Sequence, residues 1–481
     1  MDFDEYSFAD LLSNIVDNRG KTCPVEDKGF PLIATNCIKD DSLYPVFEKV
    51  RFVSDDTYKN WFRGHPNAGD IIFVCKGSPG RVAWVKEPVS FCIAQDMVAI
   101  RADQRLVDPM FLFSLLRSEQ VINKINNMHV GTLIPHFKKG DFKNLYLSIP
   151  RNLKIQRAIG LFYFSLSEKI EKNKEINQTL EQMAQALFKS WFVDFDPVKA
   201  KMAVLDAGGS QADATLAAMT AISGKDADAL AVFEREHPEQ YAELKATAEL
   251  FPSAMQESEG RDIPKGWAVV KTEELTSKIG MGPFGSNIKV STFVDEGIPI
   301  ISGQHLKESI LNDGENNFVT LEHADKLKSS NVFSEDIIFT HAGSIGQVSI
   351  IPEFSEYDRY VISQRQFFLR ADKKLISPYY LLYFFRSRTG QHLLLSNASQ
   401  VGVPSIARPS SHLKNIELVA PDFKLVKKFE DHCKTIINGV VQRKKQTVLL
   451  KNIRDTLLPK LLSGEITLPE AEQAVSEAEN V

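Results

Sequence analysis

The sequence holds 481 residues, of which 43% are hydrophobic, and this length exceeds what one hydrophobic core usually organises. No run approaches the roughly eighteen apolar residues of a membrane span, and the acidic start MDFDEYSFAD lacks the basic flank of a secretory signal. We therefore expect two or more domains, no membrane contact and a cytoplasmic location. The cysteines form no Cys-x-x-Cys pair, so we expect reduced core residues rather than a zinc site or disulfides at Cys23, Cys37, Cys75, Cys92 and Cys433.

The formal net charge of −5 is unevenly distributed along the chain. Residues 196–262 hold six Lys and Arg against thirteen Asp and Glu, and residues 464–481 hold five Glu and no basic residue. The rest of the chain therefore has a formal charge of +7. A modestly basic body with acidic appendages is compatible with DNA binding, because Lys and Arg neutralise phosphates.

One pattern of elements occurs twice in the chain. A strand, a glycine-containing turn and a second strand are predicted at 69–85 by GDIIFVCKGSPGRVAWV and again at 335–351 by EDIIFTHAGSIGQVSII. Further on, VDPMFLFSLLRS matches ISPYYLLYFFRS, and in this pair Asp108 and Ser377 are predicted helix N-caps, each followed by proline. The spacing indicates duplication of a whole domain.

After Pro150 and Pro421 the pattern becomes helical in both copies. Apolar residues recur at steps of three and four from Ile155 to Trp191 and from Phe429 to Leu461. Neither helix can bury its stripe alone, so we expect the two to pair. About forty residues at about 1.5 Å each form a rod on the order of 60 Å, which suits a spacer between two domains. The Ala-rich segment at 203–244 predicts a helical extension or linker, and the Glu-rich end predicts a frayed tail.

No motif in the sequence predicts an active site convincingly. Gly20-Lys21-Thr22 is similar to the end of a phosphate-binding loop, but the glycine required five positions earlier is Ile15. FVDFDPVK at 192–199 is similar to an amino-methyltransferase signature but lacks its second proline and its aromatic residue, so a helix end is the better interpretation. GMGPFGSN at 280–287 is interpreted as a surface loop. With no metal-ligating spacing of histidines, the sequence predicts a binding protein without a catalytic or metal site.

Two strings at the ends of the long helices resemble a known family. ALFKSWFVDFDPVKAKMA at 186–203 and LKNIRDTLLPKLLSGEI at 450–466 resemble the central and C-terminal conserved regions of specificity subunits of type I restriction-modification systems. ISQR at 362–365 and VPSI at 403–406 are similar to stretches of the family's recognition domains. The resemblance covers essentially the whole chain. It implies a non-catalytic subunit whose two target recognition domains each read one half of a split, asymmetric target in double-stranded DNA.

The resemblance also implies the partners of this chain. The two long helices would fix the gap between the half-targets and dock two methyltransferase subunits, which bring S-adenosylmethionine and methylate adenine. Restriction subunits, with ATP and magnesium, would join through that complex, and this chain itself would hold no cofactor. Two alternatives stay open at this point: a DNA methyltransferase or nuclease with diverged motifs, and a DNA-binding regulator without restriction partners.

The predicted fold is α+β, with a pseudo-two-fold internal repeat. Two similar α/β target recognition domains are separated by two long helices that pair as an antiparallel coiled coil. The expected parts are the first recognition domain at 1–151, the first long helix at 152–203, a helical extension or linker at 204–260, the second recognition domain at 261–421, the second long helix at 422–463 and an acidic tail at 464–481.

The candidate DNA contacts are polar and basic side chains on loops beside the repeated strands, where Arg and Lys suit guanine, and Asn and Gln suit adenine. In the first copy these are Lys21, Lys76, Ser78, Arg81, Gln95, His136 and Lys138, and in the second Ser286, Asn287, His341, Ser344, Gln347, Gln364, Arg365 and Arg408. Each has a plainer interpretation as a solvated loop charge or a turn-stabilising side chain.

Comparison of the copies refines this set of residues. Gln95 and Gln364 keep the same type, which suggests a shared structural or backbone role, whereas Arg81 against Gln347 and His136 against Ala407 differ, as readers of different bases would. The aromatic cluster Phe188, Trp191 and Phe192 exceeds what a two-helix seam needs, so we expect it, with Leu457 and Leu461, to bind a methyltransferase subunit.

Overall fold

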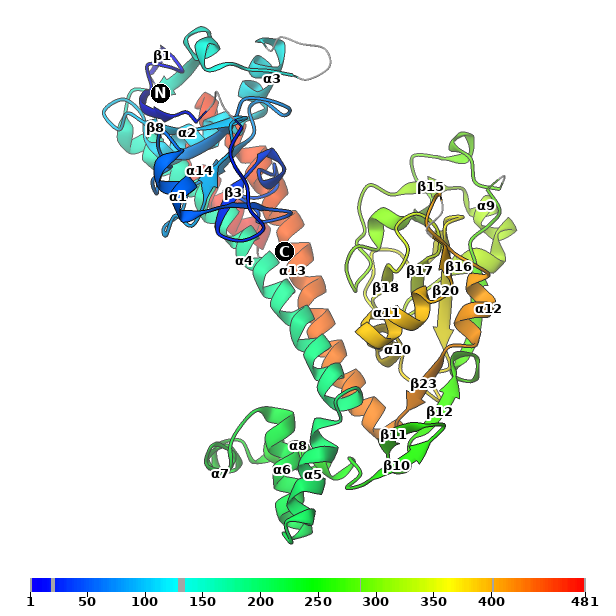
Figure 1. The fold of residues 1–481 in the computed structure, drawn as a ribbon. Coiled ribbons are helices and arrows are strands. Elements are labelled where there is room, and N and C mark those ends of the chain that lie inside the picture. The colour runs from blue at the N-terminus through cyan, green and yellow to red at the C-terminus, as the bar shows by residue number, and fades with distance from the viewer. Residues whose placement is uncertain (1, 19–21, 129–134, 286, 400–401, 480–481) are drawn as a thin grey trace. The chain divides into compact units, whose positions relative to one another are not determined.

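The computed structural model describes residues 2–18, 22–128, 135–285, 287–399 and 402–479 (Figure 1). The chain divides into two compact units, which we call unit 1 (residues 1–175 and 443–481) and unit 2 (residues 176–442). Each unit contains one copy of the sequence repeat and a part of both long helices. The two long helices are therefore each divided between the units.

Unit 1 is built on a four-stranded sheet whose neighbouring strands are antiparallel. Its strand order is β2 (Leu12–Val16), β8 (Met97–Ala102), β5 (Ile71–Val74) and β6 (Val82–Trp84). A second sheet contains β4 (Arg51–Val53), β3 (Phe30–Ile33) and β7 (Cys92–Ile93), and β1 (Phe3–Ser7) pairs with β9 (Tyr146–Pro150). Three helices complete this copy: α1 (Asp55–Asn60), α2 (Pro109–Leu116) and α3 (Glu119–Met128).

Unit 2 repeats this arrangement and adds strands to it, among them β16 (Asn331–Val332) in its second sheet. Its main sheet has the order β13 (Thr276–Met281), β20 (Gln366–Ala371), β17 (Ile337–Thr340) and β18 (Val348–Ile350). The second sheet contains β15 (Asn317–Val319), β14 (Ile298–Ile301), β19 (Tyr360–Ile362) and β16, and β12 (Ala268–Lys271) pairs with β23 (Glu417–Ala420). Two short pairs, β10 (Met255–Ser258) with β11 (Arg261–Pro264) and β21 (Ala398–Ser399) with β22 (Ser405–Ile406), have no counterpart among the described strands of unit 1. The helices of this copy are α9 (Leu321–Lys326), α10 (Pro378–Arg386), α11 (Arg388–Leu395) and α12 (Pro409–Lys414).

Local details confirm the duplication. The Asp108 side chain accepts hydrogen bonds from the backbone N–H groups of Met110 and Phe111, and the Ser377 hydroxyl accepts one from Tyr379, so both predicted N-caps are present. The buried Asp70 carboxylate pairs with the Arg101 guanidinium, at 2.7 Å from its Nε, and Asp336 pairs with Arg370 at the same distance in unit 2. Each copy therefore fixes its central strands with the same devices.

The long helices are α4 (Leu153–Phe192) and α13 (Phe423–Ser463), and within each unit they lie side by side (Figure 1). In unit 1 Ile159, near the start of α4, shares a core with Leu461, near the end of α13. In unit 2 Phe192, at the end of α4, lies 5.2 Å from the ring of Phe429, near the start of α13. The predicted antiparallel pairing is therefore confirmed. Where polar residues interrupt the seam in unit 1, Asn173 donates to Gln446 Oε1 at 2.9 Å.

The first long helix ends where its apolar pattern ends and is shorter than the expected range 152–203. It ends at Phe192, Phe195 takes a left-handed conformation with a φ of 57°, and α5 (Asp196–Asp206) begins directly after it. The interpretation of FVDFDPVK as a helix end is confirmed. The Ala-rich extension is helical, as expected, and consists of α6 (Gln211–Ser223), α7 (Ala227–Glu236) and α8 (Pro238–Glu249) packed with α5.

The acidic tail is also ordered, which corrects the expectation of a frayed end. It forms α14 (Leu468–Glu479), and Ala471 is fully buried in the core of unit 1 with Leu468 and Val475 packed around it. These three residues lie three and four positions apart, so they share one helix face while the glutamates occupy the others. A prediction made from the high glutamate content of this segment therefore misses the short amphipathic pattern.

The described residues contain no disulfide and no cluster of His, Cys, Asp and Glu that could hold a metal ion. Four cysteines are buried as expected, but Cys23 is partly exposed. Among the helices that the structure describes, none is long and apolar enough to cross a membrane.

Candidate nucleic-acid interface

The repeated glycine turn joins a central strand of each main sheet to the neighbouring edge strand. In unit 1 it links β5 to β6 and contains Lys76, Ser78 and Arg81, and in unit 2 it links β17 to β18 and contains His341, Ser344 and Gln347. Gly77 and Gly343 have φ values of 88° and 87°, a region that residues with a Cβ rarely adopt. The turn therefore has the same backbone in both units and different side chains.

A second loop lies against each turn and contains the paired glutamines. In unit 1 the N–H of Lys76 donates to Asp96 O at 3.2 Å, which places the Gln95 loop beside the turn. In unit 2 the N–H of His341 donates to Arg365 O at 2.9 Å, and the His341 ring lies 3.1 Å from Gln364 O through Nε2. Gln95, Gln364 and Arg365 are exposed.

A third loop adds His136 and Lys138 in unit 1 and Arg408 in unit 2. Gly77 N donates to Pro135 O at 3.1 Å, and Gly343 N donates to Pro404 O at 2.9 Å. An isolated bridge pairs Lys76 with His136 and, in the second copy, Ala342 with Ser405. The structural counterpart of His136 is therefore Ser405, and the comparison with Ala407 made from sequence was wrong by two residues.

In unit 2 a fourth loop, Gly282 to Asn287, follows β13 and reaches the same end of the sheet. Gly282 N donates to Gln366 O at 2.9 Å, and a Cβ at Gly285 would lie 2.3 Å from Gln364 Oε1. Asn287 is exposed, and its carbonyl lies 2.8 Å from His323 Nε2 of α9. Lys21 and Ser286 lie outside the described residues.

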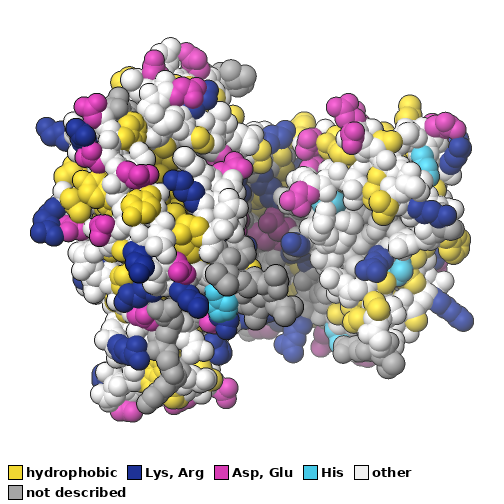
Figure 2. Space-filling view, turned by 90° about the horizontal axis from the view of Figure 1, so that it is seen from above, with side chains coloured by type: hydrophobic (Ala, Val, Ile, Leu, Met, Phe, Trp, Pro, Cys, Tyr) yellow, Lys and Arg dark blue, Asp and Glu magenta, His cyan; other side chains and the backbone are white. Residues whose placement is uncertain are grey.

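The structure thus brings together candidates that are far apart in the sequence. At one end of its main sheet, unit 1 gathers Lys76, Ser78, Arg81, Gln95, His136 and Lys138, and unit 2 gathers Asn287, His341, Ser344, Gln347, Gln364, Arg365 and Arg408. Figure 2 shows basic, histidine and acidic side chains among hydrophobic ones over the surface of unit 2, the right-hand lobe in this view. The basic and amide side chains gathered at the end of the sheet suit the phosphates and base edges of DNA.

Comparisons with known proteins identify the family. Residues 23–182 match the family model described as Type I restriction modification DNA specificity domain. The HindI specificity subunit of a type I restriction enzyme from Haemophilus influenzae is 30% identical over 83% of this chain and 86% of its own length. The chain belongs to the type I specificity subunits. The MjaIX specificity subunit from Methanocaldococcus jannaschii is 22% identical over 84% of this chain and 78% of its own.

A solved structure has the same fold. The crystal structure of the S subunit of a type I restriction-modification system from M. genitalium aligns over 96% of both chains, with a TM-score of 0.50 and 15% identity. The present chain is therefore the non-catalytic subunit that directs a restriction-modification complex, which replaces the two alternatives left open by the sequence.

Not all candidate side chains of this specificity subunit are equally available. Arg81 is half-buried, and its Nε pairs with Asp40 at 2.9 Å. Gln347 is also half-buried, because it accepts from Thr340 Oγ1 at 2.9 Å and donates to Gly303 O at 3.0 Å. Burial lowers the pKa of His341, which favours the neutral ring at neutral pH. Exposed Lys138, Gln364 and Arg408 are better placed to meet a ligand.

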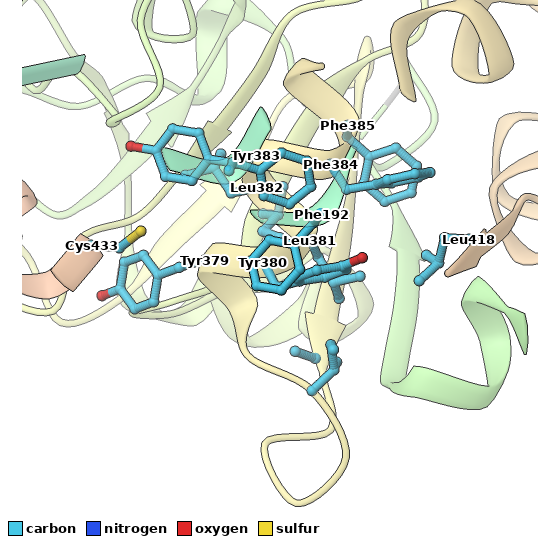
Figure 3. Packing of buried hydrophobic residues seen from close by; sticks show 14 of the residues in the cluster. Phe192, Tyr379, Tyr380, Leu381, Leu382, Tyr383, Phe384, Phe385, Leu418 and Cys433 are labelled. Carbon is cyan, nitrogen blue, oxygen red and sulfur yellow. The ribbon is translucent and has the colours of Figure 1, made fainter. Parts of the chain in front are cut away.

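The residues expected to bind a methyltransferase subunit are packed inside this chain. Phe188, Trp191 and Phe192 are at most 4% exposed. Trp191 lies 5.2 Å from the Phe251 ring, and Phe192 lies 5.0 Å from the Tyr380 ring of α10 (Figure 3). In unit 1 Leu461 is fully buried and Leu457 is half-buried.

The prediction of a docking surface made of these side chains is therefore wrong for the four buried residues, Phe188, Trp191, Phe192 and Leu461. The aromatic side chains at the end of α4 pack against α10 and against the segment after α8. The sequence shows that more rings are present than two helices require, but it does not show which element covers them.

Proposed function

We propose that each unit of this specificity subunit reads one half of a split, asymmetric target in double-stranded DNA. The observation that supports this most strongly is the repeated interface: the same loops meet at the same end of the same sheet, with different side chains. Lys76 stands where the second copy has Ala342, and His136 where it has Ser405. Because a lysine can donate to guanine whereas an alanine offers no hydrogen bond, such differences would select different half-targets.

We further propose that the paired helices α4 and α13 set the gap between the half-targets and dock two methyltransferase subunits. Three large apolar side chains on these helices support a docking role, because they face solvent instead of the seam: Leu161, Met183 and Val448 are 47%, 54% and 58% exposed. Two partners match an internal repeat in which the two helices exchange roles. The methyltransferase subunits would bring S-adenosylmethionine and methylate adenine, and restriction subunits with ATP and magnesium would join through the same complex.

Sequencing of N6-methyladenine tests this function. The chain and its neighbouring methyltransferase are expressed in a host without DNA methylation, and the matched control expresses the methyltransferase alone. A split motif that appears only with both subunits is the expected result. The same motif without this chain, or no motif although the two subunits co-purify, would contradict target selection by this chain.

A further inference from the structure

Phe284 is the most exposed of the large hydrophobic residues that the structure describes, with 85% of its surface accessible. It lies in the loop that follows β13, between buried Pro283 and exposed Gly285. A phenylalanine so open to water contributes nothing to the core, so its side chain is available to a partner.

The loop holds Phe284 at a defined place. Gly282 donates to Gln366 O at 2.9 Å, and its backbone runs so close to Ser363 that a Cβ would lie 2.0 Å from the carbonyl oxygen. In the segment that follows Phe284, Asn287 N donates to Phe284 O at 2.8 Å. The flank before Phe284 is therefore fixed to the start of β20, and the Asn287 carbonyl, 2.8 Å from His323 Nε2, ties the flank after it to α9. The loop thus holds Phe284 next to the polar loops.

The surroundings of Phe284 fit nucleic acid. Exposed Gln364 and Arg365 follow Ser363 directly, and the third loop adds Arg408 together with Val403, which is 63% exposed. Guanidinium groups suit phosphates and base edges, while an exposed ring suits the flat faces of bases. A protein surface would also accept the ring, but the cations and amides around it favour DNA.

The two copies differ at this position. The strand registers pair Leu12 with Ala102 and Thr276 with Ala371, so β2 and β13 correspond at a constant offset of 264 residues. In sequence, Gly20 then stands where the second copy has Phe284, and the segment 17–24 contains no aromatic residue. The exposed ring is a feature of the second copy.

We propose that Phe284 inserts between neighbouring base pairs of the half-target read by unit 2 and unstacks them. Apolar wedges of this kind kink DNA at the cost of stacking, and flexible pyrimidine–purine steps lower that cost. The inference rests on the proposed function and deepens it: unit 2 selects its half-target partly by deformability, whereas unit 1 does not. It also eases extrusion of the adenine that a methyltransferase subunit must take out of the stack.

The test uses this chain in complex with its methyltransferase, and duplexes that contain the motif found by N6-methyladenine sequencing. 2-Aminopurine, which brightens when it is unstacked, replaces one base at successive positions of each half. The variants are Phe284→Ala, Phe284→Leu and the control Phe354→Ala. Phe354 is a 57% exposed phenylalanine of unit 2 that follows β18 at the strand end away from the turn.

Besides the adenine that a methyltransferase subunit takes out of the stack, we expect wild type and Phe354→Ala to brighten the probe at one further step, in one half-target only. Phe284→Ala should abolish this signal and weaken binding about ten-fold, as loss of one base–aromatic stack does. Phe284→Leu should keep part of both, because leucine is also a wedge. Wild-type complex that binds but brightens the probe at no position other than the extruded adenine, or Phe284→Ala that binds and brightens like wild type, would overturn the insertion. Absence of any split motif for wild type would instead refute the proposed function and the insertion with it.

Discussion

At the scale of single residues, the polar side chains of the second hairpin turn divide into exposed and internally bonded ones. Ser344 faces solvent, whereas Gln347 bridges Thr340 and Gly303. Gln366 Nε2 extends the same network to Thr340 Oγ1 at 3.4 Å. A side chain that reads bases needs free hydrogen-bonding groups, and those of Gln347 are already bonded within the protein. Gln347 therefore stabilises the turn and does not contact bases.

Replacement of Gln347 by alanine should therefore act on stability. We expect Gln347→Ala to lower the free energy of unfolding by about 1–2 kcal/mol, because Thr340 and the Gly303 carbonyl lose their partner. Ser344→Ala, in the same turn, should leave it unchanged. Urea denaturation of wild type and the two variants measures the difference. An unchanged midpoint for Gln347→Ala would contradict a structural role and make Gln347 a candidate for contact with bases again.

Glu335 gives unit 2 a dependence on pH. It is 7% exposed at the start of the turn-forming strand, where it pairs with Lys373 and lies 3.5 Å from Lys434 of α13. Burial raises the pKa of this carboxyl, but the two lysines outweigh burial and the net pKa is lowered. A group with a lowered pKa stabilises the folded state above its unfolded value of about 4.3, and this contribution is lost as pH falls through the folded value.

We expect Glu335→Gln to lower the free energy of unfolding at pH 7 by about 1–2 kcal/mol, because the charged pairs with lysine are lost. The difference from wild type should shrink as pH falls below about 4, where the wild-type carboxyl is also neutral. Urea unfolding between pH 7 and pH 3 measures both. A difference that does not change with pH would show that the carboxylate charge is not what stabilises this site.

At the scale of elements, α14 shows how a short helix can be hidden by its composition. Its buried face consists of Leu468, Ala471 and Val475, which pack on the core of unit 1. We expect Ala471→Asp to lower the unfolding free energy by about 3 kcal/mol, because a carboxylate would enter an apolar site. Gln473→Asp, on an exposed position of the same helix, is the matched control. Equal stability of the two variants would mean that the tail does not pack as described.

Features that depend only on residues close together in the chain were predictable from the sequence. The caps at Asp108 and Ser377 need only a side chain and the next turn of the helix, and the glycine turns need only a backbone conformation. Contacts between distant segments were not. That α10 covers Phe192, and that Ser405 rather than Ala407 matches His136, depends on which loops meet in space. The internal repeat predicted the fold because the two copies share their pattern of strands and helices. It did not predict these contacts, because an alignment of the two copies does not show which loops meet in space.

At the scale of the whole molecule, the chain is one domain plan used twice, with parts of α4 and α13 in both units. Under the proposed function, a duplicated plan with divided helices would let one chain read an asymmetric target. The shared sheets and ion pairs preserve the fold, while the loops at one sheet end vary freely because they contribute little to the core. Substitutions in the loops of one unit would then change the half-target that this unit reads and leave the half-target of the other unit unchanged.

Variants confined to one unit test most directly whether the two units read separate halves of the target. Gln364→Ala with Arg365→Ala changes exposed side chains of unit 2, and Gln95→Ala with Lys138→Ala changes those of unit 1. N6-methyladenine sequencing of each double variant, expressed with the methyltransferase, reads both halves of the motif at once. We predict that each pair relaxes one half of the motif, a different half for each unit, and leaves the other half and the gap unchanged. Relaxation of both halves by either pair, or of the same half by both, would contradict the account.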